Sequence, residues 1–154
     1  PHRSMLALGR TSFVMQKIGS GFPAFVGNVW ERLCQTAVSG NELFGHTWGM
    51  ARRWWGKASV YEDGHKTPVG YEDLEFDVVA EAIGDKNTIL VGECKWKSAD
   101  FADRLLAKLK AKTEKAPFSQ GKNIVYVLFL KEHPLSEVDC CILYPDDVLK
   151  YQPE

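Results

Sequence analysis

The sequence predicts an α/β protein in which helices flank a central mixed sheet, and three observations indicate this class. Two continuous apolar runs, at residues 123–130 and 138–144, are typical of strands that are covered on both faces. Two stretches with apolar residues at helical spacing, residues 22–38 and 99–115, alternate with the predicted strands. The composition, with 45% hydrophobic and 25% charged residues in a chain of 154, suits one globular domain.

The first element of the predicted fold is the helix over residues 22–38. Pro23 suits its first turn, and Gly40 suits the position just after its end. Four residues at four-residue spacing predict its buried stripe: Phe25, Val29, Leu33 and Ala37. Glu31 is the only acid on this helix, and two interpretations of it stay open. It either pairs with Arg32 or with solvent, or it reaches a site as an outer metal ligand.

Residues 1–22 are predicted to form a helical lead-in to a domain over residues 23–154. Apolar residues in this stretch suggest one or two amphipathic helical turns, broken by Gly9 and by Gly19-Ser20-Gly21. The stretch has no initiator methionine and has the pattern of neither a signal peptide nor a membrane span. We therefore expect the chain to be a fragment of a longer protein that is not in a membrane.

The cysteines indicate a reducing compartment. Cys34, Cys94, Cys140 and Cys141 lie inside predicted elements without the spacing of a metal site, which is typical of buried thiols in the cytoplasm. The four histidines are scattered along the chain, which argues against a zinc site. We therefore expect a cytoplasmic protein.

The segment at residues 74–97, LEFDVVAEAIGDKNTILVGECKWK, predicts a β-hairpin. Turn-forming residues at 84–87 separate two apolar runs. Side chains alternate along a strand, so the first strand should have two faces: Glu75, Asp77 and Val79 on one, Phe76, Val78 and Ala80 on the other. The second strand should likewise separate Val91, Glu93 and Lys95 from Leu90, Gly92, Cys94 and Trp96.

Asp77, Glu93 and Lys95 form the most informative combination in the chain. If the hairpin pairs the Asp77 face with the Glu93 face, two carboxylates and one ammonium group converge among apolar neighbours. Carboxylates that hold Mg²⁺ can activate water and neutralise charge on phosphorus, as phosphodiester hydrolysis requires. Lys95 would then orient or deprotonate the water, or offset the charge of the transition state. The alternative is that this Glu-x-Lys triplet is a solvated edge or a surface ion pair.

The predicted helix at residues 99–115 follows Ser98, which can cap it, and carries lysines toward its end, as the helix dipole prefers. Its predicted buried stripe consists of Phe101, Leu105, Leu106 and Leu109. Basic residues on the same helix form a second stripe that could track the phosphates of a nucleic acid: Arg104, Lys108, Lys112 and Lys115. A solvated helix face explains this stripe equally well. After the last strand, a short helix should open at Pro145.

A second basic group, Arg52 and Arg53, precedes Trp54 and Trp55. These cations and aromatic rings could bind nucleic acid and stack on its bases. The interpretation that we favour for the tryptophans is burial in the first strand, with at most one exposed. The net charge of −1 lacks the basic balance of a stand-alone DNA binder. Glycines and a proline within residues 62–72 indicate a loop that borders the site.

The order of these residues along the chain resembles the order of the motifs in a known superfamily. Glu31 on a helix, Asp77 in EFDVVA and the triplet Glu93-Cys94-Lys95 in GECKWK are similar to the motifs of the PD-(D/E)xK nucleases. More narrowly, segments within residues 25–115 resemble the C-terminal domain of uncharacterised function that follows an AAA-type ATPase module in archaeal and bacterial proteins: VWERLCQ, RRWW, EFDVVA and GECKWK. Phe76 replaces the proline of the superfamily motif, and the Gln and Tyr signature of RecB-type members is not evident.

The resemblance implies a restriction-endonuclease-like αβββαβ core and hydrolysis of DNA by metal-activated water. It makes Asp77 and Glu93 ligands of Mg²⁺ or Mn²⁺, with the Cys94 carbonyl completing the shell. Glu31 would be an auxiliary ligand, and Lys95 would assist the water.

The resemblance also implies partners. The first is an ATPase module of the same polypeptide, since no GxxxxGK[ST] phosphate loop occurs in this chain. Restriction-type relatives often dimerise, so a homodimer is a second expectation. The alternative function is a catalytically silent DNA-binding or regulatory module attached to the ATPase, and a nuclease-like toxin or defence component is a third.

Overall fold

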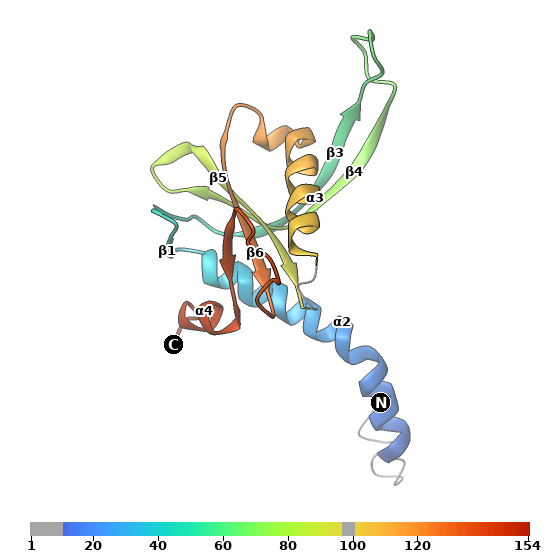
Figure 1. Cartoon of the computed structure of the whole chain (residues 1–154), viewed down its shortest axis with the longest axis vertical. Coiled ribbons are helices and arrows are strands. Elements are labelled where there is room, and N and C mark those ends of the chain that lie inside the picture. Colours follow the sequence, from blue (N-terminus) through green and yellow to red (C-terminus); the bar gives the residue numbers. More distant parts are fainter. Residues whose placement is uncertain (1–10, 97–100) are drawn as a thin grey trace.

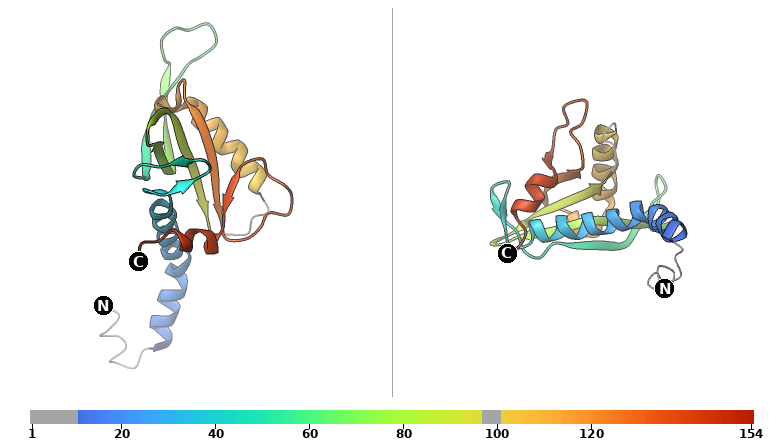
Figure 2. Two further views of the ribbon diagram at one scale, coloured as in Figure 1. Left: turned by 90° about the vertical axis from the view of Figure 1, so that its left-hand side faces the viewer. Right: turned by 90° about the horizontal axis from the view of Figure 1, so that it is seen from below.

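The computed structural model describes residues 11–96 and 101–154, and a central sheet lies at its core (Figure 1). Five strands of this sheet lie in the order β3-β4-β5-β6-β7. The helix α2 (Thr11–Val38) and the short helix α4 (Pro145–Lys150) pack on one face, and α3 (Ala102–Lys115) packs on the other (Figure 2). This arrangement confirms the predicted α/β class with a mixed sheet flanked by helices.

The sheet is mixed because its two halves pair in different directions. β3 (Arg52–Val60), β4 (Gly70–Ala82) and β5 (Asp85–Lys95) are antiparallel neighbours. β6 (Asn123–Leu130) and β7 (Cys141–Leu143) extend the sheet with parallel pairing. The strand predicted over residues 138–144 is shorter than expected. The Cys140 amide donates a turn hydrogen bond to the Val138 carbonyl at 2.9 Å, and only three residues pair with β6.

The hairpin predicted over residues 74–97 forms as β4 and β5. Its turn contains Gly84, whose φ of 82° is a conformation that glycine adopts without strain. The Asp85 carboxylate accepts hydrogen bonds from the Asn87 amide at 2.9 Å and from the Thr88 hydroxyl at 2.6 Å. These bonds fix the start of β5, so the predicted hairpin is confirmed, although its turn lies at residues 83–84 and not at 84–87.

The helix α2 is longer than the sequence predicts. It runs without a break through Gly19-Ser20-Gly21, where an interruption is predicted, and it begins at Thr11 instead of residue 22. Glycine costs only about 1 kcal/mol relative to alanine inside a helix, so a long helix tolerates two of them. The turns predicted around Gly9 lie outside the described residues, and the domain boundary after residue 22 stays a prediction. The small strands β1 (Glu42–Leu43) and β2 (His46–Thr47) follow the helix.

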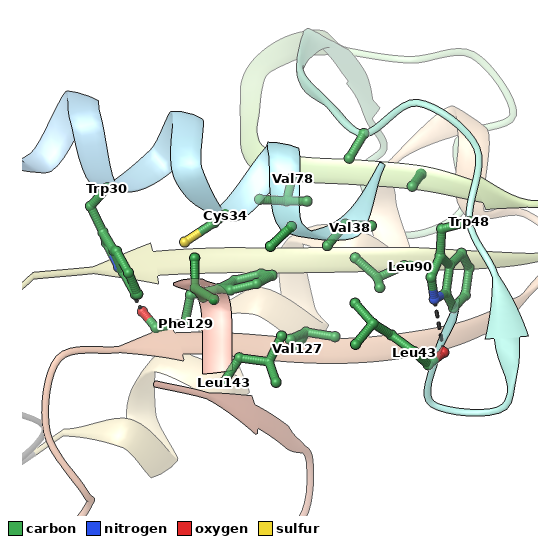
Figure 3. Packing of buried hydrophobic residues seen from close by; sticks show 14 of the residues in the cluster. Trp30, Cys34, Val38, Leu43, Trp48, Val78, Leu90, Val127, Phe129 and Leu143 are labelled. Atoms are coloured by element: carbon green, nitrogen blue, oxygen red, sulfur yellow. Dashed lines mark hydrogen bonds between the residues drawn. The ribbon is translucent and has the colours of Figure 1, made fainter. Parts of the chain in front are cut away.

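The core between α2 and the sheet (Figure 3) contains Ala37 of the predicted stripe, with Leu33 partly buried against it, but the first half of the stripe is shifted. Trp30 and Cys34 are buried, whereas Phe25 and Val29 are exposed. The N-terminal part of α2 projects beyond the sheet in Figure 1, and the first half of the predicted stripe is exposed in keeping with this. The Trp30 indole N–H donates to the Phe129 carbonyl at 3.3 Å, which ties the helix to β6.

The helix α3 covers the opposite face and buries Leu106 and Leu109, as predicted. Phe101 is exposed, because it precedes the first turn of the helix and lies at the N-cap position. The predicted cap, Ser98, and the predicted start at residue 99 lie outside the described residues. A short 3₁₀ helix (Pro117–Ser119) follows α3, and α4 opens at Pro145 as predicted.

A β-bulge interrupts β4 at Asp77 and Val78. One extra residue on β4 separates two pairing positions: Arg52 pairs with Val79, and Trp54 pairs with Phe76. The extra residue reverses the alternation, so Phe76 packs on the α3 side whereas Val78 and Ala80 pack on the α2 side. The prediction that these three side chains share one face is therefore wrong.

The strands β3 and β4 extend past the other strands as a two-stranded arm with residues 61–69 at its tip (Figure 1). The loop predicted over residues 62–72 does not border the site, because Gly70 is roughly 23 Å along an extended strand from Asp77. Near the base of the arm, Trp54 packs against Phe76 while Trp55 is 72% exposed. This confirms that at most one of the two tryptophans is exposed. No helix in the described residues combines the length and apolarity needed to cross a membrane.

Candidate active site

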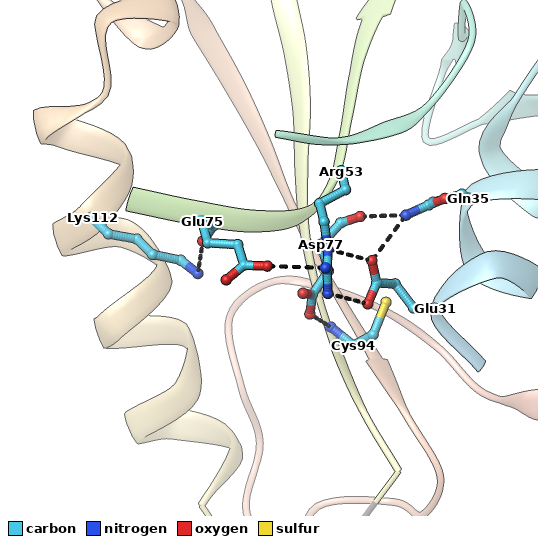
Figure 4. Close-up of polar contacts among 7 residues, drawn as sticks. All are labelled: Glu31, Gln35, Arg53, Glu75, Asp77, Cys94 and Lys112. Carbon is cyan, nitrogen blue, oxygen red and sulfur yellow. Dashed lines mark hydrogen bonds and ion pairs between the residues drawn. The ribbon is translucent and has the colours of Figure 1, made fainter. Parts of the chain in front are cut away.

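The predicted site residues come together where β4 and β5 separate, between α2 and α3 (Figure 4). Regular pairing of the two strands reaches Val78 and Gly92, and the next positions in that register are Asp77 and Glu93. There the Asp77 Oδ2 atom accepts a hydrogen bond from the Cys94 amide at 2.8 Å. The Asp77 carboxylate thus lies in the gap between the strands.

Glu93 lies beside Asp77, and its side chain is only 14% exposed. Burial, and then the charge of Asp77, raise the pKa of Glu93 above its ordinary value, although an ion pair with Lys112 opposes this. The Lys112 Nζ atom lies 2.7 Å from Glu93 Oε2, whereas the Lys95 Nζ atom lies 4.0 Å from Oε1. The predicted carboxylates and Lys95 are therefore neighbours, and a second lysine lies closer.

Glu31 enters the site from α2 and is held by groups that the sequence analysis did not connect with it. Arg53 binds it through two hydrogen bonds, at 2.9 Å to Oε1 and 3.0 Å to Oε2. Gln35 also donates to Glu31 Oε1 at 3.2 Å and to the Asp77 carbonyl at 2.9 Å. Burial raises the pKa of Glu31 despite the Arg53 pair. The partner of Glu31 is thus Arg53 and not Arg32.

Arg53 also links Glu31 to β4, because its Nη1 atom lies 3.2 Å from Glu75 Oε1. This arginine was predicted as a nucleic-acid contact, and its guanidinium group is engaged by two acids. The neighbouring Arg52 instead contacts the Met50 sulfur at 3.1 and 3.2 Å. The two arginines therefore have different surroundings.

The basic stripe predicted on α3 is divided in the same way. Arg104 and Lys108 are exposed, and the Arg104 guanidinium lies 5.2 Å from the centre of the Phe101 ring. Lys112 lies in the candidate site, and Lys115 forms an ion pair with a glutamate of β4 at 2.9 Å. The first half of the stripe thus remains an open surface.

Cys94 points away from the charges beside it in the sequence, as predicted. Its side chain packs against the core on the α2 side, near Cys34. Burial raises the pKa of the Cys94 thiol well above its ordinary value, which favours the neutral thiol. Its backbone amide faces the site, where it donates a hydrogen bond to Asp77.

The metal expected here was Mg²⁺ or Mn²⁺. In the part of the chain that the structure describes, no three His, Cys, Asp or Glu side chains are arranged to hold a metal ion. The oxygen donors of Asp77 and Glu93 nevertheless fit these cations, because Mg²⁺ is often bound through one or two carboxylates and keeps several waters. Glu31 would join such a shell only by exchanging its Arg53 partner.

From the sequence, Gln35 and Glu75 are not predicted as site residues, and Arg53 and Lys112 are predicted only as possible nucleic-acid contacts. Gln35 follows Glu31 by one helical turn, which is a detectable signal. Glu75 precedes Asp77 by two residues on the same strand, which is another. The positions of Arg53 and Lys112 depend on how β3 and α3 pack against β4 and β5, and no local pattern encodes this.

Comparisons with known proteins identify a family. Residues 1–114 match DUF234, described as archaeal and bacterial proteins of unknown function. No curated protein and no solved structure matches the chain. The matched residues include all four predicted catalytic positions, Glu31, Asp77, Glu93 and Lys95, and α3 to its penultimate residue. Because the match spans more than half of the chain, this protein belongs to the DUF234 family of archaea and bacteria.

Proposed function

We propose that this chain is a metal-dependent nuclease-like domain that hydrolyses DNA phosphodiester bonds. The observation that carries the proposal is the 2.8 Å hydrogen bond from the Cys94 amide to Asp77, which places that carboxylate beside Glu93. The sequence resemblance of EFDVVA and GECKWK to the PD-(D/E)xK nucleases supports the same function. Both lines point to the side chains of Asp77 and Glu93, and the resemblance adds that of Lys95.

Asp77 and Glu93 would hold Mg²⁺ or Mn²⁺, with the Cys94 carbonyl and Glu31 as further ligands. Such an ion, when bound, polarises a phosphoryl oxygen and lowers the pKa of a water molecule. A carboxylate that is fixed through one oxygen can offer its other oxygen to a cation. Asp77 is fixed in this way by Cys94, and Glu93 is fixed through Oε2 by Lys112.

Lys95 would assist the attacking water. Its ammonium group lies 4.0 Å from Glu93 Oε1, and its side chain is 50% exposed, so it can reach both the carboxylate and a substrate in solvent. A cation at this position can orient water or offset the negative charge of the transition state. Arg53 and Lys112 are engaged by acids, so phosphate contacts farther from the site would fall to Arg52, Arg104 and Lys108.

The proposed domain would act with an AAA-type ATPase module of the same polypeptide in the cytoplasm. This partner rests on the sequence resemblance, and a homodimer that cuts both strands is compatible with it.

A catalytically silent DNA-binding or regulatory module is the second candidate. The ion pairs of Glu93 with Lys112 and of Glu31 with Arg53 favour it, because they satisfy both acids without a metal ion. In such a module the same charges would hold α2 and α3 against the sheet. The two candidates differ in whether a divalent ion binds to Asp77 and Glu93.

Cleavage of single-stranded and double-stranded DNA and RNA with Mg²⁺, Mn²⁺ or EDTA tests the proposal. The wild-type chain is compared with Asp77→Ala and Lys95→Ala, and two matched controls replace exposed residues outside the site, Asp73→Ala on the strand of Asp77 and Lys86→Ala on the strand of Lys95. Metal-dependent cutting that is lost in the first two variants and kept in the controls supports the nuclease. Folded protein that binds DNA without cutting it supports the silent module.

A further inference from the structure

Lys112 is the most closely held cation of the candidate site. Its Nζ atom donates to Glu93 Oε2 and to the Glu75 carbonyl, both at 2.7 Å, and lies 4.7 Å from the centre of the Phe76 ring. Its side chain is 26% exposed, against 50% for Lys95. Lys112 thus bridges β4 and β5 just past the point at which their regular pairing ends.

The charges around Lys112 limit how many metal ions the site can take. Four carboxylates lie together in the described residues, those of Glu31, Glu75, Asp77 and Glu93. The side chains of Arg53, Lys95 and Lys112 accompany them. The group therefore carries a net charge of −1, which one divalent ion would turn to +1 and two would turn to +3. The net charge of +3 that two ions would leave is costly in a partly buried site.

The geometry of Glu93 agrees with this charge count. Its Oε2 atom is taken by Lys112 at 2.7 Å, which leaves Oε1 as the oxygen that a metal ion can approach. A carboxylate that bridges two ions needs both of its oxygens. An ammonium group on Oε2 therefore stands where the second ion of a two-ion site would be.

We propose that Lys112 supplies the positive charge that a second metal ion would bring, so that the site takes one divalent ion, bound through Asp77 and Glu93 Oε1. The inference rests on the proposed function, because it requires that a metal ion binds. It differs from a purely structural role for Lys112 in one measurable respect. Removal of a structural support weakens metal binding, whereas removal of a competing charge strengthens it.

A titration with Mn²⁺ tests the proposal that the site takes one ion. Free Mn²⁺ is measured by its electron paramagnetic resonance signal, and DNA cleavage is measured in parallel. The wild-type chain should bind one ion. Lys112→Gln should bind Mn²⁺ at least about fivefold more tightly, because even in water a unit charge at 4 Å changes the binding of a cation by that factor. The same variant should cleave DNA more slowly, because the positive charge of Lys112 no longer helps the bound ion to offset negative charge in the site. Lys86→Gln, which replaces an exposed lysine at the start of β5 and outside the site, should match the wild type in both assays.

Lys112→Arg keeps the charge and should keep single-ion binding, so it tests the proposal even if the Gln variant is poorly folded. Two ions bound by the wild type or by Lys112→Arg would overturn the inference. Unchanged or weaker Mn²⁺ binding by folded Lys112→Gln would also overturn it, while leaving the metal site itself in place. No Mn²⁺ binding by the wild type would instead remove the proposed function and this inference with it.

Discussion

Gly92 should be required for the packing of β5, and Gly92→Ala measures how tightly this part of the core is filled. A Cβ atom at this position would lie 2.7 Å from Phe129 Cε2 and 3.2 Å from Val78 Cβ. Both neighbours are fully buried, so neither can move aside without displacing further side chains. We expect Gly92→Ala to lower the free energy of unfolding by about 1–3 kcal/mol, the usual cost of overpacking.

Urea unfolding followed by fluorescence measures this cost, which corresponds to a fall of roughly 1 M in the midpoint. Gly27→Ala is the matched control, because its Cβ would meet no atom within 4 Å, and it should stabilise the helix by up to about 1 kcal/mol. Phe129→Leu should relieve the contact, so the two changes together should cost at least about 0.5 kcal/mol less than their sum. Additive costs, or a Gly92→Ala variant as stable as the wild type, would show that the ring does not limit this position.

Three further predictions concern Glu93, the tryptophans and a buried thiol. Because the folded pKa of Glu93 is raised above its ordinary 4.5, the folded state binds more protons and gains stability as the pH falls from neutral toward 4.5. Urea unfolding at several pH values should show a smaller gain in Glu93→Gln, and an equal gain would contradict this origin. Trp54→Ala should cost about 3 kcal/mol while the exposed Trp55→Ala costs less than about 0.5 kcal/mol, and similar costs in urea unfolding would contradict their assigned surroundings. The fully buried Cys34 should react with an aromatic disulfide reagent only when the protein unfolds, and prompt labelling of Cys34 itself in the folded protein would refute its burial.

The sequence predicts the fold class well because each main element has its own local signal. The apolar run of β6 and the Pro145 start of α4 follow from short-range chemistry. The turn at Gly84 does so as well, since its positive φ needs glycine. Errors arise where packing overrides these patterns. The stripe on α2 is decided by which part of the helix lies over the sheet, and the residues in that part include Trp30 but not Phe25.

The candidate site is less predictable than the fold because half of it depends on contacts between distant segments. The order of Glu31, Asp77, Glu93 and Lys95 is visible in the sequence, and the structure brings the first three so close that, beside burial, the charge of Asp77 raises the pKa values of Glu31 and Glu93. The role of Lys112 is not visible, since 19 residues separate it from Glu93 and only the packing of α3 joins them. A basic residue on an amphipathic helix looks the same whether it faces solvent or a buried acid.

The bulge at Asp77 explains how one carboxylate can serve both faces of the sheet. A side chain on a regular strand approaches groups on one face only. Asp77 lies in the gap between β4 and β5, and its charge raises the pKa of Glu31 on the α2 side and of Glu93 on the α3 side. An alternation without the bulge would keep Asp77 on the face opposite Phe76, where it could approach Glu31 but would be separated from Glu93 by the sheet. The bulge, and not the identity of the acids alone, therefore makes a shared site for ligands from α2, β4 and β5.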